Sequence, residues 1–429
     1  MFGFANFLLL ALFAAAVFDL IFALARGGGL RGALHGLWNT PHLLFGQQLA
    51  EWRLQLGRIL FAAGLAAYEI SVVFCNSMAR QNWAWVQGVM SPVLEWLAFL
   101  CFGAKILFGT RYTWRELLAG GALYFIARWV YFNSQNIWWI GIVVAVLAAK
   151  DVPLRRPLQV YFASGCAAMA VVLALHFAGI VAPDLTSERM GALRGTYGYG
   201  HPNTFGGLVF GLVLAYALLR AQKVRWVDCL LVFAVGVFLL VGPASRSAAL
   251  CTLALAVGLV FCRLRAGHSV LRWWPGTCAG MVGLTAAVSY LLPLLVIKVG
   301  PWNNDIGPAW LAKLDSLLTC RISLTWMAYR LLDVKIAGQV FNWPTVDNSF
   351  AFALFQFGPV VAALLGILFA AALLGHAKQG RRVEVCCLFA MLAYAYMEVQ
   401  PFHLTTNPTA LLLCGAVFAQ TSARWQKIE

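Results

Sequence analysis

The stretch GYGHPNTFGG, at positions 198–207, lies where a polar loop runs into an apolar segment. The change from polar to apolar residues predicts the start of a membrane-spanning helix. Pro202 suits the first turn of a helix, and it keeps His201 outside the helix. The apolar residues 203–220 approach the length of about 20 residues that a bilayer span requires. The sequence therefore predicts a membrane span with ionisable groups at its border, where such groups usually mark a substrate path or a reaction site.

The composition extends this interpretation to the whole chain. Apolar residues make up 62% of 429 positions and charged residues 11%, whereas a soluble domain carries about 25% charged residues. We predict an all-α polytopic membrane protein with about 12–13 transmembrane helices in a single integral membrane domain, 1–429. Residues 1–25 lack a basic n-region and a cleavage site, so we expect a retained span. The thirteen candidate spans are 3–25, 58–78, 86–108, 115–132, 134–149, 157–182, 203–220, 226–243, 246–262, 275–297, 348–374, 383–400 and 406–421.

The basic residues predict the orientation of the chain in the membrane. Alternating spans place 21 of the 31 Lys and Arg residues on one side. By the positive-inside rule, the N-terminus is expected outside and the C-terminus in the cytoplasm. The net charge of +15 then reflects topology and contact with anionic lipid headgroups, and it does not indicate nucleic-acid binding.

The eleven cysteines do not form a recognisable framework. Ten lie in or at the edges of the predicted spans, Cys320 alone lies in a predicted outer loop, and none belongs to a CxxC pair. Such cysteines are typical small core residues. We therefore predict neither a disulfide nor a metal site.

Two predicted outer segments stand out by length and polarity, 183–202 and 299–346. In the second segment, leucine and isoleucine recur at helical spacing between Leu311 and Leu332, which predicts one or two amphipathic helices. This large extracytoplasmic helical loop lies between the tenth and eleventh predicted spans. Together the two segments form the expected cap of an active site.

Several arginines lie on the outer side, where positive charge is normally scarce. They can extend to the lipid headgroups. Alternatively they can converge on an anionic ligand, because the planar guanidinium matches the oxygens of a diphosphate. These residues are Arg189, Arg194, Arg246, Arg321 and Arg330.

Other polar residues have both a structural and a chemical interpretation. Asp347, followed by Asn348, opens a predicted span, where an Asp can cap the helix or act as a general base. Asn203 begins a helix whose free N–H groups would attract an anion. Glu69 and Glu95 lie within predicted spans, where they fit either a protonated hydrogen-bonded carboxyl or a proton-coupled transporter.

Four short elements follow one another along the middle and C-terminal two-thirds of the chain. They are Arg189…Arg194-Gly195…Gly200-His201-Pro202-Asn203…Gly206, Ser245-Arg246-Ser247, Leu314…Leu317-Leu318-Thr319-Cys320-Arg321 and Asp347-Asn348-Ser349-Phe350…Gly358. In their order and spacing they resemble the O-antigen polymerase/ligase superfamily, in particular its Wzy-type polysaccharide polymerases. In the ligase branch a His-Asn pair opens the span after the large outer loop, and here Asp347-Asn348 stands in its place.

The resemblance implies a GT-C-like, metal-independent glycosyltransferase in the bacterial cytoplasmic membrane, with no cofactor. Its donor and acceptor would be oligosaccharides linked to polyprenyl diphosphate, and a chain-length regulator and a flippase are further expected partners besides the lipid bilayer. Arg246 and Arg321, with Arg194, would bind the diphosphate, and Asp347 or His201 would act as the base. The further expected substrate-binding residues are Arg189, Asn203, Arg330 and Asn348.

Three other hypotheses stay open at this point: a transporter, a different enzyme of similar architecture, and a non-catalytic scaffold. A flippase or another secondary transporter would use Glu69 or Glu95 for ion coupling and would favour inverted repeats. A ligase would transfer finished glycan to an acceptor, and a peptidoglycan polymerase of the SEDS type shares much of this architecture. A non-catalytic membrane scaffold is the third hypothesis.

Overall fold

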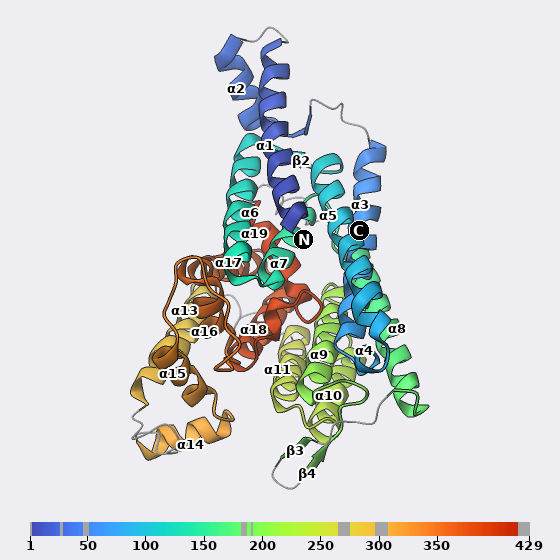
Figure 1. The fold of residues 1–429 in the computed structure, drawn as a ribbon, viewed down its shortest axis with the longest axis vertical. Helices are drawn as coiled ribbons and strands as arrows, with labels where there is room; N and C mark the ends of the chain where they lie inside the picture. The colour runs from blue at the N-terminus through green and yellow to red at the C-terminus, as the bar shows by residue number, and fades with distance from the viewer. Residues whose placement is uncertain are drawn as a thin grey trace. The chain divides into compact units, whose positions relative to one another are not determined.

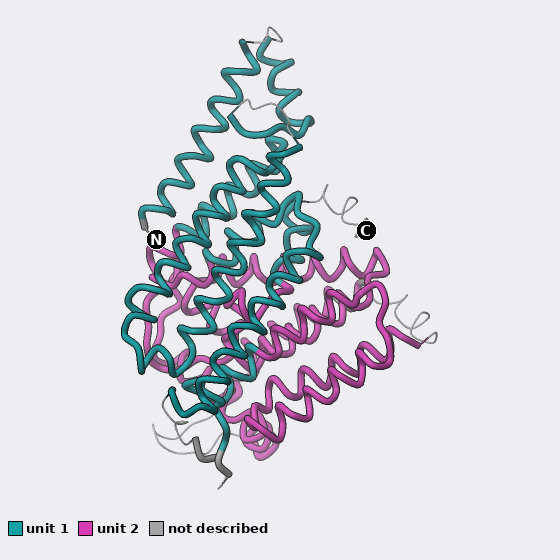
Figure 2. Tube along the Cα trace, turned by 90° about the vertical axis from the view of Figure 1, so that its right-hand side faces the viewer, with its two compact units in different colours: residues 1–128, 140–208, 410–429 teal, residues 129–139, 209–409 magenta. Residues whose placement is uncertain are grey.

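The computed structural model describes residues 2–25, 29–45, 51–181, 187–189, 192–264, 275–296 and 308–418, which are mostly helical (Figure 1). The chain forms two compact units, coloured separately in Figure 2, and each is described by itself below. Unit 1 comprises residues 1–128, 140–208 and 410–429, and unit 2 comprises residues 129–139 and 209–409. That both belong to one membrane domain stays a prediction.

Within the described residues, seven helices are long and apolar enough to cross a membrane, which is the character expected of an all-α membrane protein. Shorter apolar helices occupy four other predicted spans in the described part of the chain, and the count of 12–13 spans stays a prediction. The seven helices are Gly3–Ala25, Glu51–Cys75, Val86–Phe108, Arg155–Phe177, Pro202–Leu219, Arg246–Arg263 and Pro359–Lys378.

Unit 1 is centred on α3 (Glu51–Cys75), which packs against α5 (Ser91–Phe108) and α8 (Arg155–Phe177) (Figure 1). Gly57 of α3 and Gly109 at the end of α5 permit the close approach, because a Cβ on Gly57 would lie 2.9 Å from the Gly109 carbonyl oxygen. The unit boundary falls within α6, α7 and α9. The helices are α1 Phe2–Ala25, α2 Gly29–Asn39, α3 Glu51–Cys75, α4 Ala79–Asn82, a π-helical turn Val86–Met90, α5 Ser91–Phe108, α6 Trp114–Ser134, α7 Ile137–Ala148, α8 Arg155–Phe177, α9 Pro202–Leu219 and α19 Cys414–Val417.

Short antiparallel strand pairs connect these helices. Strands β1 (His42–Leu43) and β2 (Arg111–Tyr112) form one pair. Within the segment 183–202, which was expected to be an outer loop, β3 (Ser187–Arg189) and β4 (Ala192–Arg194) form a hairpin.

A buried group of charges joins the end of α5 to the turn after α7. Lys105 donates to Thr110 Oγ1 at 2.6 Å, and Lys150 lies 3.3 Å from Glu116 and 3.8 Å from Asp151. Burial raises the pKa of Asp151, but the positive charges of Lys150 and Lys105 outweigh burial, so the pKa lies below its ordinary value.

Unit 2 is built on helix pairs. Helix α10 (Trp226–Val241) packs against α11 (Arg246–Arg263), α11 packs against α18 (Arg382–Met397), and α13 (Pro275–Leu291) packs against α17 (Pro359–Lys378). Figure 2 shows its helices in magenta. Its helices are α10 Trp226–Val241, α11 Arg246–Arg263, α13 Pro275–Leu291, a 3₁₀ turn Leu292–Leu295, α14 Ala309–Leu317, α15 Arg321–Leu331, α16 Ser349–Phe352, a π-helical turn Ala353–Phe357, α17 Pro359–Lys378, α18 Arg382–Met397 and a 3₁₀ turn Gln400–Phe402.

The structure corrects two predicted spans. The segment 348–374 is not one helix, because the chain breaks at Gly358 (φ 87°) before Pro359 starts α17. A Cβ on Gly358 would lie 2.2 Å from the Ile336 carbonyl oxygen, so a neighbouring segment occupies the break. The segment 406–421 was also expected to span, but its described part holds a 3₁₀ helix, Pro408–Leu413, followed by the single turn of α19.

The long segment 299–346 contains two helices in its described part, α14 and α15, as its leucine pattern predicted. Leu311 of α14 and Ile322 of α15 pack with Val296 in a small apolar cluster. The side of the membrane on which this segment lies stays a prediction.

Candidate functional site

Arg321 is the first residue of α15, and an unusual turn places it there. Thr319 and Cys320 both adopt positive φ values, 56° and 64°, which β-branched and bulky residues rarely do. The buried carboxylate of Asp315, in the preceding helix α14, accepts the N–H of Ile322 at 2.8 Å and so caps α15. The local structure therefore fixes the position of Arg321 independently of any ligand.

Arg321 and Glu398 form a buried ion pair in unit 2. Arg321 Nη2 lies 2.7 Å from Glu398 Oε1, and the two side chains are only 8% and 6% exposed. Ser247, the second residue of α11, donates to the same carboxylate oxygen at 2.9 Å. Three elements that are distant in the sequence, α11, α15 and the loop after α18, thus meet at one carboxylate.

The guanidinium of Arg321 is saturated by protein acceptors. It has five N–H groups, and each of them faces one partner. A phosphate oxygen can therefore contact Arg321 only by replacing one of these partners. They are the carbonyl oxygens of Met397 and Leu318, the hydroxyls of Thr319 and Ser247, and the carboxylate of Glu398.

Glu398 lies in the loop that follows the last residue of α18. The hydroxyl of Ser349 donates to the backbone carbonyl oxygen of Glu398 at 2.5 Å. This contact places Asp347, two residues before Ser349, near Glu398. The site therefore combines one saturated guanidinium with two neighbouring carboxyl groups.

Asn348, and not Asp347, caps the helix that follows. Asn348 Oδ1 accepts the N–H groups of Phe350 and Ala351 at 2.9 and 3.0 Å. Its amide nitrogen donates to Ser289 Oγ at 2.9 Å, so Asn348 also ties α16 to α13. The amide expected to bind substrate is thus committed to the protein.

Asp347 is half-buried, and no hydrogen bond to its side chain is formed within the described residues. The sequence left open whether this acid is a cap or a base. Because Asn348 caps the helix, the carboxylate of Asp347 is not used as a cap, and its chemistry fits that of a general base.

Arg246 and Arg330, the other two predicted site arginines in unit 2, differ in their surroundings. Arg246 is exposed and begins α11, immediately before Ser247. Arg330 is exposed nine residues after Arg321 on the same helix, which corresponds to about 13 Å along the axis and the opposite face. Its guanidinium lies 5.5 Å from the ring centroid of Trp326. Arg330 therefore does not converge with Arg321.

In unit 1 the predicted residues gather at the start of α9, which begins at Pro202 as expected. The N–H of Asn203 donates to His201 Nδ1 at 3.1 Å, so His201 caps the helix. Arg194, which is 7% exposed, donates to Asn203 Oδ1 at 2.9 Å. His201 and Thr204 also line a pocket. The side chain of Arg189 lies outside the described part of the chain.

The sequence pointed to the individual residues of the site around Arg321, but it did not predict which of them are in contact. Glu398 was visible as a carboxyl at the end of an apolar segment, but its partner Arg321 is 77 residues away. Ser247 was visible only as part of a short motif. Among the described residues, no group of three or more His, Cys, Asp or Glu is arranged to hold a metal ion.

Comparison with known proteins does not extend these observations. No protein-family model, no curated protein and no solved structure matches the chain.

Proposed function

We propose that this protein is a membrane glycosyltransferase that polymerises oligosaccharide repeat units linked to polyprenyl diphosphate. The product would be a surface polysaccharide, made at the outer face of the bacterial cytoplasmic membrane. One observation carries the proposal: Asp347 does not cap its helix, and it lies two residues before Ser349, which contacts the backbone of Glu398 in the buried pair with Arg321. An acid released from a structural role, beside fixed positive charge, fits general-base chemistry on a phosphate-activated substrate.

The reaction transfers a growing glycan from its carrier to a new repeat unit. A hydroxyl oxygen of the acceptor attacks the anomeric carbon of the donor and forms the new C–O bond. The bond between that carbon and the diphosphate oxygen breaks, and polyprenyl diphosphate leaves with the electron pair. Asp347 takes the proton of the attacking hydroxyl, and the anomeric configuration inverts.

The arginines have separate tasks in this proposal. Arg246, exposed at the N-terminus of α11, binds the diphosphate together with the first N–H groups of that helix. Arg321, whose five donors are occupied, is a positioning residue that holds Glu398 and Ser247 and contributes its charge. His201 and Arg194 belong to unit 1, where His201 is the alternative base.

The experiment compares variants at two adjacent residues in a cell that depends on this gene for polymer. Asp347→Asn should fold normally and reduce polymer synthesis by about 10²–10⁴-fold. Asn348→Ala should instead lower the amount of folded protein. Normal polymer from normally expressed Asp347→Asn would remove Asp347 as the base, and loss of polymer in His201→Ala would then favour His201.

Arg246→Lys and Arg246→Gln test the diphosphate contact. Lysine retains the charge but not the planar fork, so we expect a partial loss of polymer with Arg246→Lys and a larger loss with Arg246→Gln. Full-length polymer from both variants at normal expression would contradict the assignment.

A further inference from the structure

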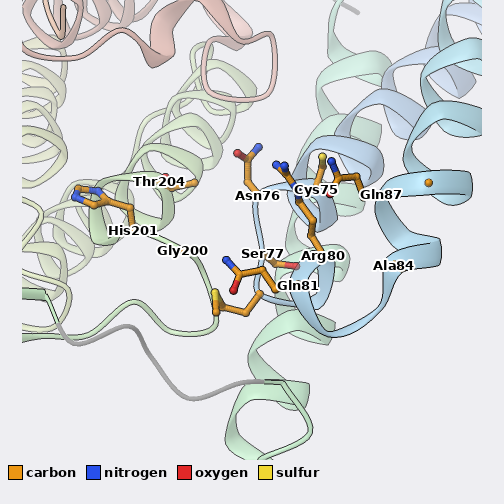
Figure 3. A pocket seen from close by; sticks show the side chains of 12 residues that line it. Cys75, Asn76, Ser77, Arg80, Gln81, Ala84, Gln87, Gly200, His201 and Thr204 are labelled. Atoms are coloured by element: carbon orange, nitrogen blue, oxygen red, sulfur yellow. Dashed lines mark hydrogen bonds between the residues drawn. The ribbon is translucent and has the colours of Figure 1, made fainter. Parts of the chain in front are cut away.

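Unit 1 contains an open pocket of about 970 Å³. One wall is the segment 75–88, between α3 and α5, and the other is the start of α9. Figure 3 shows Asn76, Arg80 and Gln87 on the first wall, and His201 and Thr204 on the second. Small-molecule sites occupy roughly 300–1,000 Å³, so this pocket has room for a short oligosaccharide.

Backbone hydrogen bonds hold the two walls together. The N–H of Met78 donates to the carbonyl oxygen of Gly198 at 2.8 Å. Ser77 and Tyr199 form an antiparallel bridge next to it. Gly198 adopts a φ of 81°, and a Cβ there would lie 3.0 Å from His176, so glycine permits this close contact. The pocket is therefore formed within unit 1 before any ligand binds.

The lining of the pocket combines polar and apolar groups, and none of its described lining residues is an acid. Asn76, Gln81 and Gln87 supply side-chain amides, and Thr204 supplies a hydroxyl. Asn76 donates one N–H to the Val72 carbonyl oxygen at 2.8 Å and keeps its second N–H for a ligand. Gln87 Oε1 accepts from Arg80 at 2.9 Å, so Gln87 keeps its amide N–H groups for a ligand. Amides and hydroxyls suit the hydroxyl groups of a sugar. The described lining residues include Arg80 and no Asp or Glu, which favours an anionic over a cationic ligand.

Arg80 gives the pocket its positive charge. Its Nε donates to Gln87 Oε1 at 2.9 Å, which orients the guanidinium. The two terminal NH₂ groups are then presented together, and this fork binds carboxylates through two parallel hydrogen bonds.

We propose that this pocket binds the glycan part of a lipid-linked substrate through an acidic sugar. Arg80 binds the sugar carboxylate, and the amides of Asn76, Gln81 and Gln87 bind the neighbouring hydroxyls. The identification of the ligand as a substrate rests on the proposed function. The binding itself does not, because it requires no reaction.

Gly88 offers a way to close the pocket without substituting any of the proposed catalytic residues. It lines the pocket, and a Cβ built on it meets no atom within 4 Å. Gly88→Phe should therefore occupy the pocket without straining the backbone. Gly3→Phe is the matched control, because Gly3 lies in α1 and its Cβ also meets no atom within 4 Å.

The experiment measures binding to the purified full-length protein in nanodiscs of a zwitterionic lipid. The probes are a disaccharide ending in glucuronic acid, the same disaccharide ending in glucose, and glycerol 3-phosphate. A hydrogen bond to a charged group corresponds to about tenfold in affinity or more, so we expect the acidic disaccharide to bind at least about tenfold more tightly than the neutral one.

Variants of Arg80 and Gly88 test which residues cause the preference for the acidic disaccharide. Arg80→Gln should abolish the preference and Arg80→Lys should retain part of it. Gly88→Phe should weaken both disaccharides, whereas Gly3→Phe should change neither. Equal affinity for the two disaccharides, or normal binding to Gly88→Phe, would overturn the proposal. Tighter binding of glycerol 3-phosphate than of the acidic disaccharide would also overturn it, because the pocket would then be a phosphate or headgroup site.

These results are independent of the proposed polymerase reaction. Asp347→Asn protein should bind the acidic disaccharide normally. Sugar binding together with normal polymer from Asp347→Asn would leave the pocket assignment intact and contradict the catalytic one.

Discussion

Replacing Glu398 by Gln tests whether the buried pair of Arg321 and Glu398 organises the site in unit 2. Glutamine keeps an oxygen that can accept from Ser247 and Arg321, but it removes the negative charge. Both side chains are less than 10% exposed, so solvent compensates little for the loss. Removing one partner of a buried pair costs about 3–5 kcal/mol, because the other charge stays buried without compensation.

We expect the low end of that range, about 3 kcal/mol, since the hydrogen bonds have an acceptor left. For a unit of about 200 residues this corresponds to a fall in apparent Tm of about 6 °C or more. The assay is thermal unfolding of the purified protein in detergent at neutral pH, followed by tryptophan fluorescence.

The matched control is Glu384→Gln. Glu384 is also buried and lies in α18, but it forms no ion pair within the described residues. Its substitution should change the free energy of unfolding by less than about 1 kcal/mol. Arg321→Gln combined with Glu398→Gln should cost less than the sum of the two single changes, by about 2 kcal/mol or more. An additive double variant, or equal effects of Glu398→Gln and Glu384→Gln, would refute this account of the pair.

Three further predictions concern local structure. Asp151→Asn should destabilise unit 1 by about 3 kcal/mol, because it removes the negative charge that faces Lys150 and Lys105 and leaves Lys150 paired with Glu116. Since the pKa of Asp151 is lowered in the fold, its contribution is present above about pH 4 and is lost as the pH falls further, so the Tm of the variant should depend less on pH in acid than that of wild type. Asn348→Ala should cost about 2 kcal/mol in thermal unfolding, through loss of the cap and of the bond to Ser289, and an unchanged Tm would contradict the capping role. Gly358→Ala should cost at least about 2 kcal/mol because of its positive φ and the contact with Ile336, whereas Gly366→Ala in the open part of α17 should be neutral or stabilising.

The sequence predicted the helices where apolar residues were continuous and their ends carried clear signals. Pro202 marked the start of α9 correctly, and the leucine spacing predicted the helices α14 and α15. The break at Gly358 escaped prediction because apolar residues flank it on both sides. The break is stabilised by the close contact of Gly358 with the backbone of Ile336. Ile336 is too far from Gly358 in the sequence for the local residue pattern to reveal this contact.

The site was harder to predict for two physical reasons. Asp347 and Asn348 both suit a helix cap, and only the positions of the N–H groups of Phe350 and Ala351 decide between them. The pairing of Arg321 with Glu398 depends on tertiary packing between segments that carry no common signal. The pocket around Arg80 lies in a segment whose polar residues read as an ordinary connection between two spans.

The proposed polymerase reaction is tested most directly by the glycans that remain on polyprenyl diphosphate when the gene is deleted. The measurement is mass spectrometry of these carrier-linked glycans, combined with labelling from outside the cell. The account predicts that single repeat units accumulate at the outer face. Long polymer on the carrier would indicate a ligase instead, and single units confined to the inner face would indicate a flippase; either result would contradict the account.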